Sequence, residues 1–546
     1  MSSPRLRHVS LLLLTVLLML PVLAVFVSWL PWGEQAERAL PLLLEMGRTV
    51  LPDYATTTLW LCLMVSVGVI TVGLSAAVTV TLFDFPGRKT FEWALLLPLA
   101  MPAYVVAYAY TDFLQFSGPF QTMIRELTGL QGRVFPEIRN TVGAAWVMTF
   151  ALYPYVYLLA RAALGERATH LMEAARLLGA PMARRVREVA LPLARPAVAA
   201  GVALALMETL ADFGVASYFG IQTFTAGIYK AWLAMDNRVA AAQLALILLL
   251  LVMGLLALER RAQKRLRFVT GRGARAGSVE ARPVALRGKH KWLAWGVCGL
   301  PLLMGFVAPV LFMLRPLLTD WSALPWERFM GWVLNSLRLG AISAVLAVLL
   351  ALVLAFSVRR RPDGLTRAVV SLAGLGYAVP GAVIVVGLLL PVGWLQATWP
   401  QTEVGYLVTA TSLGLVWAYL VRFCAVALQS IQSGYARIPL SFDDSARMLG
   451  TGDWGLLQRV HWPLLQRSTV AATLLVFVDV MKELPATLVL RPFNSDTLAV
   501  VAYQLARDER LGEAALPSLA LVLAGLIPVI LLSRTLRSPD QTIPSC

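Results

Sequence analysis

Long apolar stretches alternate with short polar ones along the whole chain. Most apolar stretches have about 20 residues or more, which as a helix is enough to cross a hydrocarbon core about 30 Å thick. Helices satisfy their own backbone hydrogen bonds in lipid. We therefore predict an all-α, polytopic membrane protein of about twelve transmembrane helices, at roughly 9–30, 57–82, 92–115, 141–163, 196–217, 239–258, 292–316, 335–357, 367–391, 404–427, 470–490 and 514–534.

The composition supports the same class. Apolar residues make up 58% of the chain, charged residues make up 14%, and the mean hydropathy is +0.71. An outer-membrane barrel would instead show short segments that alternate between apolar and polar positions. The first apolar stretch follows Arg5, Arg7 and His8, but it is long and no small-residue cleavage site follows it. We expect it to remain as a helix rather than to be removed as a signal peptide.

Lysine and arginine are concentrated in alternate loops. Seven arginines lie in 161–195 and eleven Lys or Arg residues lie in 260–291, whereas 392–403 has none. The positive-inside rule therefore predicts that both termini are cytoplasmic. The net charge of +16 is explained by side chains that face anionic lipid headgroups. A nucleic-acid partner is not expected, because no loop is long enough to form a soluble basic domain.

The four cysteines do not indicate a disulfide framework or a metal centre. Cys62, Cys298 and Cys424 lie in three separate spans, and Cys546 is the last residue. No CxxC or other paired spacing is present. We expect no cofactor and no bound structural metal.

The chain contains an internal repeat. The motifs TTTLWL, FPGRKT and PLAMPA return in the same order as NSLRLG, RPDGLTR and GYAVPG, so that Gly87 corresponds to Gly364 and Pro102 to Pro380. A basic, Gly-rich segment joins the two copies and is expected to be a cytoplasmic linker. Six spans in each copy give a parallel repeat, and substrate pathways commonly run along the axis between such halves. The predicted division is a first half at 1–258, a linker at 259–291 and a second half at 292–546.

A polar segment also occurs twice, each time between the fourth and fifth span of a half. It reads EAARLLGAPMARRVREVALP at 173–192 and DSARMLGTGDWGLLQRVHWP at 444–463. In each copy a glycine can end the first helix in a left-handed conformation, and a second short helix follows. An interfacial amphipathic helix is the alternative interpretation. Because two copies occur at matched places, we favour a docking element over 171–192 and 442–463.

At these residues the chain resembles the permease subunits of binding-protein-dependent ABC importers, whose signature is E-A-A-x3-G-x9-I-x-L-P. The second copy departs from it, because Asp444 replaces Glu, Ser445 replaces the first Ala, and His461-Trp462 precede the proline. Arg176 and Arg447 lie three residues before the glycines and are equally compatible with an acidic partner surface and with lipid phosphate. The matching positions are Glu173, Ala174, Ala175, Gly179, Leu191 and Pro192 in the first copy, and Ala446, Gly450 and Pro463 in the second.

The resemblance implies a mechanism and a set of partners. The two segments would be coupling helices that each fit a cleft on an ATP-binding subunit. The partners would be two copies of an ATP-binding cassette ATPase and one periplasmic or extracellular solute-binding protein, at the bacterial inner membrane. The sequence has no G-x-x-x-x-G-K-[ST] motif, so we expect a channel subunit that is not itself an enzyme.

The solute is indicated less directly. The fused two-half plan and stretches such as METLADFGVASYFGIQTF and DVMKELPATLVLRPF resemble ferric iron permeases, which implies iron(III) as the cargo. The alternatives are an importer for thiamine, sulfate, a phosphonate or another small solute, and an ion-coupled secondary transporter. The tyrosines of YVVAYAYTDF at 104–113 are expected to form an aromatic belt at the membrane boundary rather than an iron pathway.

Four carboxylates lie inside predicted spans, where ionisable groups are costly and often functional. Glu208 and Asp212 are four residues apart, and Asp479 and Glu483 follow at the equivalent places 271 positions later, with Lys482 beside them. The carboxylates either line a cation pathway between the halves or have structural roles as caps and internal pairs. The sequence leaves both interpretations open.

Overall fold

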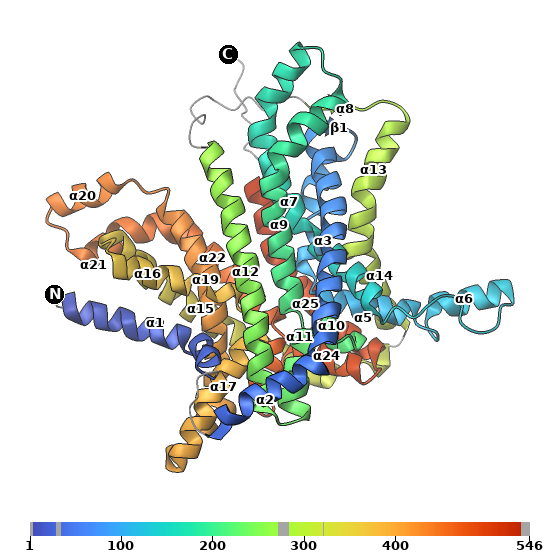
Figure 1. Cartoon of the computed structure of the whole chain (residues 1–546). Coiled ribbons are helices and arrows are strands. Elements are labelled where there is room, and N and C mark those ends of the chain that lie inside the picture. Colours follow the sequence, from blue (N-terminus) through green and yellow to red (C-terminus); the bar gives the residue numbers. More distant parts are fainter. Residues whose placement is uncertain (1–3, 29–33, 271–282, 320, 537–546) are drawn as a thin grey trace.

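The computed structural model describes residues 4–28, 34–270, 283–319 and 321–536, and within these the chain is almost entirely helical (Figure 1). Two strands of two residues each, β1 (Phe83–Asp84) and β2 (Val284–Ala285), form the one short parallel sheet of the described residues. Phe83 pairs with Val284 and Asp84 with Ala285. The end of the predicted linker is thereby fixed to the first half, while 271–282 lies outside the described residues.

The helices follow one another in two similar series. The first comprises α1 (Pro4–Val27), α2 (Glu34–Arg48), α3 (Leu51–Leu82), α4 (Arg88–Ala94), α5 (Ala103–Leu114), α6 (Pro119–Thr128), α7 (Thr141–Leu177), α8 (Met182–Arg185), α9 (Leu191–Ala211), α10 (Gly214–Phe219), α11 (Phe224–Tyr229) and α12 (Arg238–Thr270). The second comprises α13 (Lys289–Leu302), α14 (Ala308–Thr319), α15 (Trp326–Arg360), α16 (Gly364–Ala373), α17 (Gly381–Thr398), α18 (Val404–Thr409), α19 (Ser412–Tyr435), α20 (Leu440–Met448), α21 (Asp453–Leu456), α22 (Trp462–Lys482), α23 (Pro485–Leu490), α24 (Leu498–Arg507) and α25 (Leu511–Leu536).

Among the described residues, ten helices are long and apolar enough to cross a membrane, or eleven if one bent pair is counted as a span. Helix α1 (Pro4–Val27) lies at the first expected span, and its apolar part Leu11–Val27 is counted among the shorter apolar helices. The expected span at 92–115 is broken, because the helices over 88–100 and 103–128 meet at an angle of 89°.

Prolines cause this break and a matching one in the second half. Met101 before Pro102 and Val379 before Pro380 are both extended, since a proline disfavours a helical conformation in the residue that precedes it. The span expected at 367–391 therefore begins only at Gly381, after α16 and a short 3₁₀ turn. Hydropathy located the apolar segments correctly but not these interruptions.

The same tertiary contacts recur in both series. Thr58 Oγ1 on α3 accepts a hydrogen bond from the backbone N–H of Phe224 at the start of α11. Ser336 Oγ on α15 accepts one from the N–H of Leu498 at the start of α24. Thus α3 corresponds to α15, and the pair α10 and α11 corresponds to α23 and α24.

The first span of each series packs on the other series. Helix α1 contacts α16 and α17, and Trp417 Nε1 on α19 donates to the carbonyl of Leu17 over 2.8 Å. Helices α13 and α14 contact α3 and α5, and Trp295 Nε1 donates to the carbonyl of Pro86 over 2.9 Å. The two halves are therefore interlocked rather than merely adjacent.

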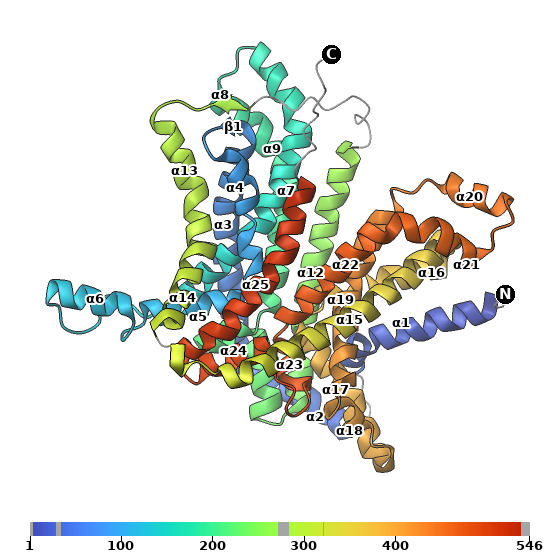
Figure 2. The same cartoon turned by 180° about the vertical axis from the view of Figure 1, so that it is seen from behind.

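The two groups of helices diverge toward one end of the molecule (Figures 1 and 2). Helix α12 and the pair α19 and α22 spread apart toward the end that carries α8, α20 and α21. They come together at the other end, where the short helices α10, α11, α23 and α24 lie. The two groups of helices therefore lie apart on the side of the repeated polar segments and close together on the opposite side.

Candidate functional site

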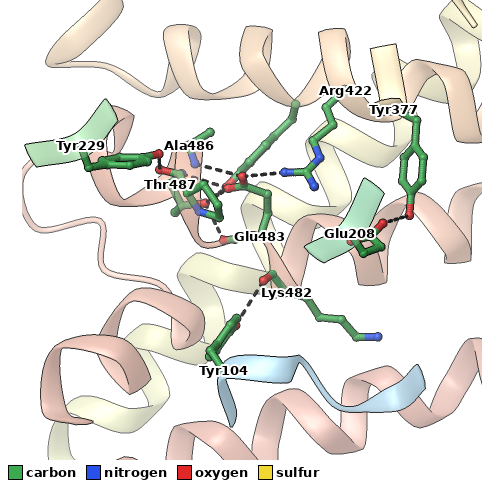
Figure 3. A network of polar contacts seen from close by, with 11 residues as sticks. Tyr104, Glu208, Tyr229, Tyr377, Arg422, Lys482, Glu483, Ala486 and Thr487 are labelled. Carbon is green, nitrogen blue, oxygen red and sulfur yellow. Dashed lines mark hydrogen bonds and ion pairs between the residues drawn. The ribbon is translucent and has the colours of Figure 1, made fainter. Parts of the chain in front are cut away.

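A cavity of about 190 Å³ lies where the two halves meet, and all four intramembrane carboxylates named from the sequence line it. Glu208 and Asp212 come from the end of α9, and Asp479 and Glu483 come from the end of α22. The structure thus brings together groups that are 271 positions apart in the chain. The tyrosines of the lining include Tyr155. Two further tyrosines and both basic side chains of the lining are labelled in Figure 3, namely Tyr104, Tyr377, Arg422 and Lys482.

Two of the carboxylates fix the backbone of the next helix. Asp212 Oδ2 accepts hydrogen bonds from the N–H groups of Val215 and Ala216, at 2.9 and 3.3 Å, at the start of α10. Glu483 accepts from the N–H groups of Ala486 and Thr487, at 2.9 and 3.0 Å, at the start of α23. Free N–H groups at a helix start favour a negative side chain. The structural interpretation therefore applies to this pair.

The other two carboxylates lie one helical turn earlier and are half-buried against the cavity. Glu208 Oε1 accepts a hydrogen bond of 2.9 Å from the hydroxyl of Tyr377, which comes from the second half. Asp479 occupies the equivalent place on α22. Neither side chain caps a helix, so the pathway interpretation remains for this pair.

The positive charges in the cavity have protein partners. Arg422 Nη1 on α19 lies 3.3 Å from Glu483 Oε1, and both side chains are largely buried. A Cβ at Gly381 would lie 2.9 Å from Glu483 Oε1 and 3.0 Å from Arg422 Nη1, so the glycine of the GYAVPG motif leaves room for this ion pair. Lys482 Nζ donates to the carbonyl of Leu99 over 3.0 Å, and Lys482's own carbonyl accepts from Tyr104.

The electrostatic balance of the cavity is acidic. Four carboxylates and two basic side chains line it, and Arg422 pairs with Glu483. Among the described residues that line the cavity, none is His or Cys, so the donors are carboxylate and phenol oxygens. Oxygen donors suit hard cations. Within the described residues no group of three or more His, Cys, Asp or Glu is arranged so that it could hold a metal ion.

The closed side of the cavity is formed by contacts between the two halves. Ser217 Oγ and the hydroxyl of Tyr503 are 2.7 Å apart, and the rings of Phe213 and Tyr503 have centroids 5.6 Å apart. Arg139 Nη1 and Nη2 donate to both carboxylate oxygens of Glu509, over 2.7 and 2.8 Å. The helices α10 and α24 therefore close the cavity at the end opposite the repeated polar segments.

Both repeated segments form the same helix–turn–helix. Gly179 and Gly450 have φ of +79° and +78°, in the left-handed region. The N–H of each glycine bonds to the residue three positions earlier, Arg176 or Arg447, and the next N–H bonds to the residue five positions earlier. This pair of bonds is a Schellman motif, which ends a helix and reverses the chain. The elbows that the sequence predicts are thus present.

The prolines that end the segments also shape the backbone. Pro192 and Pro463 have no N–H, so the helix cannot make its usual bond at these positions. Each is preceded by one turn of π-helix, at Val186–Ala190 and Leu457–His461. The two halves share this detail, which makes the second arm of each elbow continuous with α9 or α22.

The tips of the elbows expose apolar side chains. Leu177 and Leu178 are 89% and 88% exposed, and Met448 and Leu449 at the equivalent positions are 90% and 85% exposed. Glu173, Arg176, Asp444 and Arg447 are also exposed, while Ala446 is buried. Exposed apolar side chains beyond the membrane, beside charged ones, are typical of an interaction surface.

Sequence reasoning missed several residues of the cavity. Arg422 lies alone in the apolar run 404–427, and the rule that singled out the carboxylates would also have found it. Tyr104 was expected in an aromatic belt, but it lines the cavity, because the break at Pro102 brings the start of α5 into the centre. Tyr155 and Tyr377 reach the cavity only through helix packing, for which the sequence has no signal.

Comparisons with known proteins agree with this architecture. Residues 69–268 match the family "binding-protein-dependent transport system inner membrane component". The chain is 25% identical over 498 residues to the Fe(3+)-transport system permease protein FbpB 2 of Haemophilus influenzae, covering 89% of this chain and 90% of that protein. It is 24% identical over 523 residues to the probable ABC transporter permease protein y4fN of Sinorhizobium fredii, covering 89% and 88%.

A shorter relative has another solute in its name. The putative 2-aminoethylphosphonate transport system permease protein PhnU of Salmonella choleraesuis is 26% identical over 211 residues, which cover 38% of this chain and 74% of that protein. Permeases of this family are multi-pass inner-membrane proteins that work with a solute-binding protein and a separate ATPase and are not enzymes. Residues 69–268 therefore carry the inner-membrane domain of binding-protein-dependent transport systems, and the chain is similar to two permease proteins over 89% of its length.

Proposed function

We propose that this chain forms both membrane halves of an ATP-driven importer that moves iron(III), delivered by an extracytoplasmic binding protein, into the cytoplasm. The observation that carries the proposal is the cavity between the halves, where Glu208 and Asp479 face the interior without capping a helix. The similarity to an Fe(3+)-transport permease over 89% of the chain supports the same solute.

The cavity acts as a stage on the route rather than as a binding site of high affinity. A cation in the bilayer interior is costly, and two half-buried carboxylates lower that cost. The hydroxyl of Tyr377 holds Glu208 in place, and the phenols supply further hard oxygen donors. Affinity then belongs to the binding protein, which captures the solute outside and hands it over.

The repeated segments 171–192 and 442–463 dock one ATPase subunit each, so that two copies bind per chain. Their exposed apolar tips are the contact surfaces, and both lie on the side where the two groups of helices lie apart. The density of Lys and Arg on this side supports a cytoplasmic location for it and for both termini. The halves 1–258 and 292–546 then rock against each other when the ATPases close on ATP.

An anionic solute is the second candidate, because one relative is named for 2-aminoethylphosphonate and the cavity contains Arg422 and Lys482. Both basic groups are engaged, Arg422 by Glu483 and Lys482 by a backbone carbonyl. The free charge is therefore negative, which favours a cation. Thiamine is itself a cation, so it is one of the solutes compared in the experiment below. An ion-coupled secondary transporter would need no ATPase, and the same experiment tests that mechanism.

The test is uptake into proteoliposomes that contain the chain with its ATPase subunit, with the binding protein outside. Labelled iron(III), thiamine and 2-aminoethylphosphonate are compared with and without ATP inside. We expect iron(III) to accumulate only with ATP and with the binding protein. Uptake of another solute would overturn the iron assignment, and uptake without any ATPase would overturn the importer mechanism.

A further inference from the structure

The second coupling segment is fixed to α15 by an ion pair on each side of its elbow. Arg359 Nε and Nη2, near the end of α15, lie 2.8 and 3.1 Å from the two carboxylate oxygens of Asp443 on α20. Its neighbour Arg360 pairs with Asp453 on α21. Because α20 precedes Gly450 and α21 follows it, both arms of the elbow are held by adjacent residues of one transmembrane helix.

The pair of Arg359 and Asp443 belongs to a buried network. Asp443 is 3% exposed and His461 is fully buried. His461 Nε2 donates to Asp443 Oδ1 over 3.1 Å, since a carboxylate only accepts, and the hydroxyl of Tyr435 then donates to Nδ1 over 3.3 Å. Arg359 also donates to the carbonyl of Pro439. The network therefore joins α15, the end of α19, α20 and the turn before α22 at one point.

The first coupling segment has no corresponding ion pairs at the matching positions. The offset of 271 that relates the two elbows puts Leu164, Met172, Met182 and Ala190 where the second half has Tyr435, Asp443, Asp453 and His461. The offset of 278 that relates Thr58 to Ser336 puts Thr81 and Leu82 where the second half has Arg359 and Arg360. Leu164, Met172 and Ala190 are buried, so apolar contacts occupy these places in the first segment.

We propose that the two coupling segments are mechanically unequal, and that Arg359, Asp443 and His461, with Arg360 and Asp453, are positioning residues that make the second segment a rigid lever on α15. The proposal rests on the coupling function proposed above. A bidentate arginine–carboxylate pair fixes distance and orientation, whereas apolar contacts can slide. A movement of the second elbow is therefore transmitted directly to α15 and α22. Helix α22 carries Asp479.

The first experiment grafts the residues of the first half onto the second. The variant combines Arg359→Thr, Tyr435→Leu, Asp443→Met and His461→Ala. Replacing a buried ion pair by apolar residues is often neutral or stabilising, so membrane abundance and the thermal midpoint should stay at or above the wild-type values. In proteoliposomes we expect ATP hydrolysis to persist while solute moved per ATP falls at least about fivefold, the lower range of coupling between sites. An unchanged ratio would overturn the proposal.

A second set of variants decides the matter if the graft does not reach the membrane. The pair Arg360 and Asp453 is partly exposed, at 32% and 40% of the side chains, so single changes there should not prevent folding. Arg360→Asp and Asp453→Arg should each lower the solute moved per ATP, and the double variant should restore it. Single variants with the wild-type ratio, or a double variant that does not recover, would contradict the proposal.

The matched control is Glu513→Gln, which breaks the ion pair of similar exposure between Arg510 and Glu513 away from the coupling segments. It should leave the ratio unchanged. The wild-type protein separates the two levels of the argument. If the wild type shows no transport dependent on ATP, the proposed coupling function fails. If the wild type is coupled and the variants are equally coupled, only the inequality of the two levers fails.

Discussion

At the scale of single residues, the two members of each carboxylate pair have different roles, and the difference follows from their position on the helix. Glu208 and Asp479 point into the cavity from the last full turn of their spans. Asp212 and Glu483 lie just past the helix ends and satisfy the N–H groups of the next helices. Substitutions in the cavity pair should therefore affect transport, whereas substitutions in the capping pair should affect stability.

For the cavity pair, we expect Glu208→Gln and Asp479→Asn to lower iron uptake while membrane abundance stays at the wild-type level. Each change removes a negative charge from the route but keeps the size of the side chain. The measurement is initial uptake rate, normalised to the amount of protein in the vesicles. A proportional loss of abundance and uptake would return these residues to the structural interpretation.

For the capping pair, we expect a loss of stability. Asp212→Ala removes a cap, which costs about 0.5–2 kcal/mol. Glu483→Ala also leaves Arg422 buried without its partner, and breaking a buried ion pair costs about 3–5 kcal/mol. The thermal midpoint in detergent should therefore fall further for Glu483→Ala than for Asp212→Ala. Equal midpoints in the two variants would show that the contact with Arg422 contributes little.

The contribution of Asp443 to stability, through its network with Arg359 and His461, depends on pH. Burial acts to raise the pKa of this carboxyl, but hydrogen bonds from Arg359 and His461 outweigh it, so the pKa lies below the usual value. A carboxyl with a lowered pKa in the folded state contributes stability above its unfolded value, about 3.9, and loses it as the pH falls through the folded value.

The difference in thermal midpoint between the wild type and Asp443→Asn should therefore be constant from about pH 5 to pH 8 and shrink below about pH 4. The same scan on Glu513→Gln provides the baseline for a pair outside the coupling segments. A difference that already disappears by about pH 6 would contradict the assignment of this stability to the Asp443 carboxylate.

At the scale of elements, the two elbows require their glycines for conformational reasons alone. A Cβ would meet nothing within 4 Å at Gly179 or Gly450, but both have positive φ. A side chain there costs about 1–2 kcal/mol of backbone strain. We expect Gly179→Val and Gly450→Val to insert normally, hydrolyse ATP and transport little. Gly254→Ala, at a helical glycine with equally open surroundings, is the control and should remain coupled.

Pattern and repeat predicted the elements well where the signal was local. Gly179, Gly450, Pro192 and Pro463 lie at fixed spacings, and the turns form where the spacing indicates. The breaks after Met101 and Val379 were overlooked, although Pro102 and Pro380 are visible in the sequence, because hydropathy measures apolar content and not direction. The short helices α10 and α23 depend on caps from Asp212 and Glu483, for which the sequence left a structural role and a pathway role equally open.

At the scale of the whole molecule, the sequence predicted the symmetry but not the interlocking. The crossing of α1 and α13 onto the opposite halves depends on contacts such as that of Trp417 with Leu17, which no local pattern indicates. The divergence of the halves toward the coupling segments, with α10 and α24 closed at the other end, is likewise a property of the packing. In this structure the two halves lie apart on the side where the ATPase subunits are proposed to dock.

The central claim is that the ATPase subunits move both coupling segments together and so act on one cavity. The most direct test of this claim is the distance between the two coupling segments. Leu171 and Phe442 are equivalent, 52% and 48% exposed, and lie on the first arms of the two elbows. Spin labels on Leu171→Cys and Phe442→Cys would report this distance by pulsed electron resonance in the complex with its ATPase. We predict that trapping ATP shortens the distance and opens the side of α10 and α24. A distance distribution that is the same with and without ATP would contradict the account.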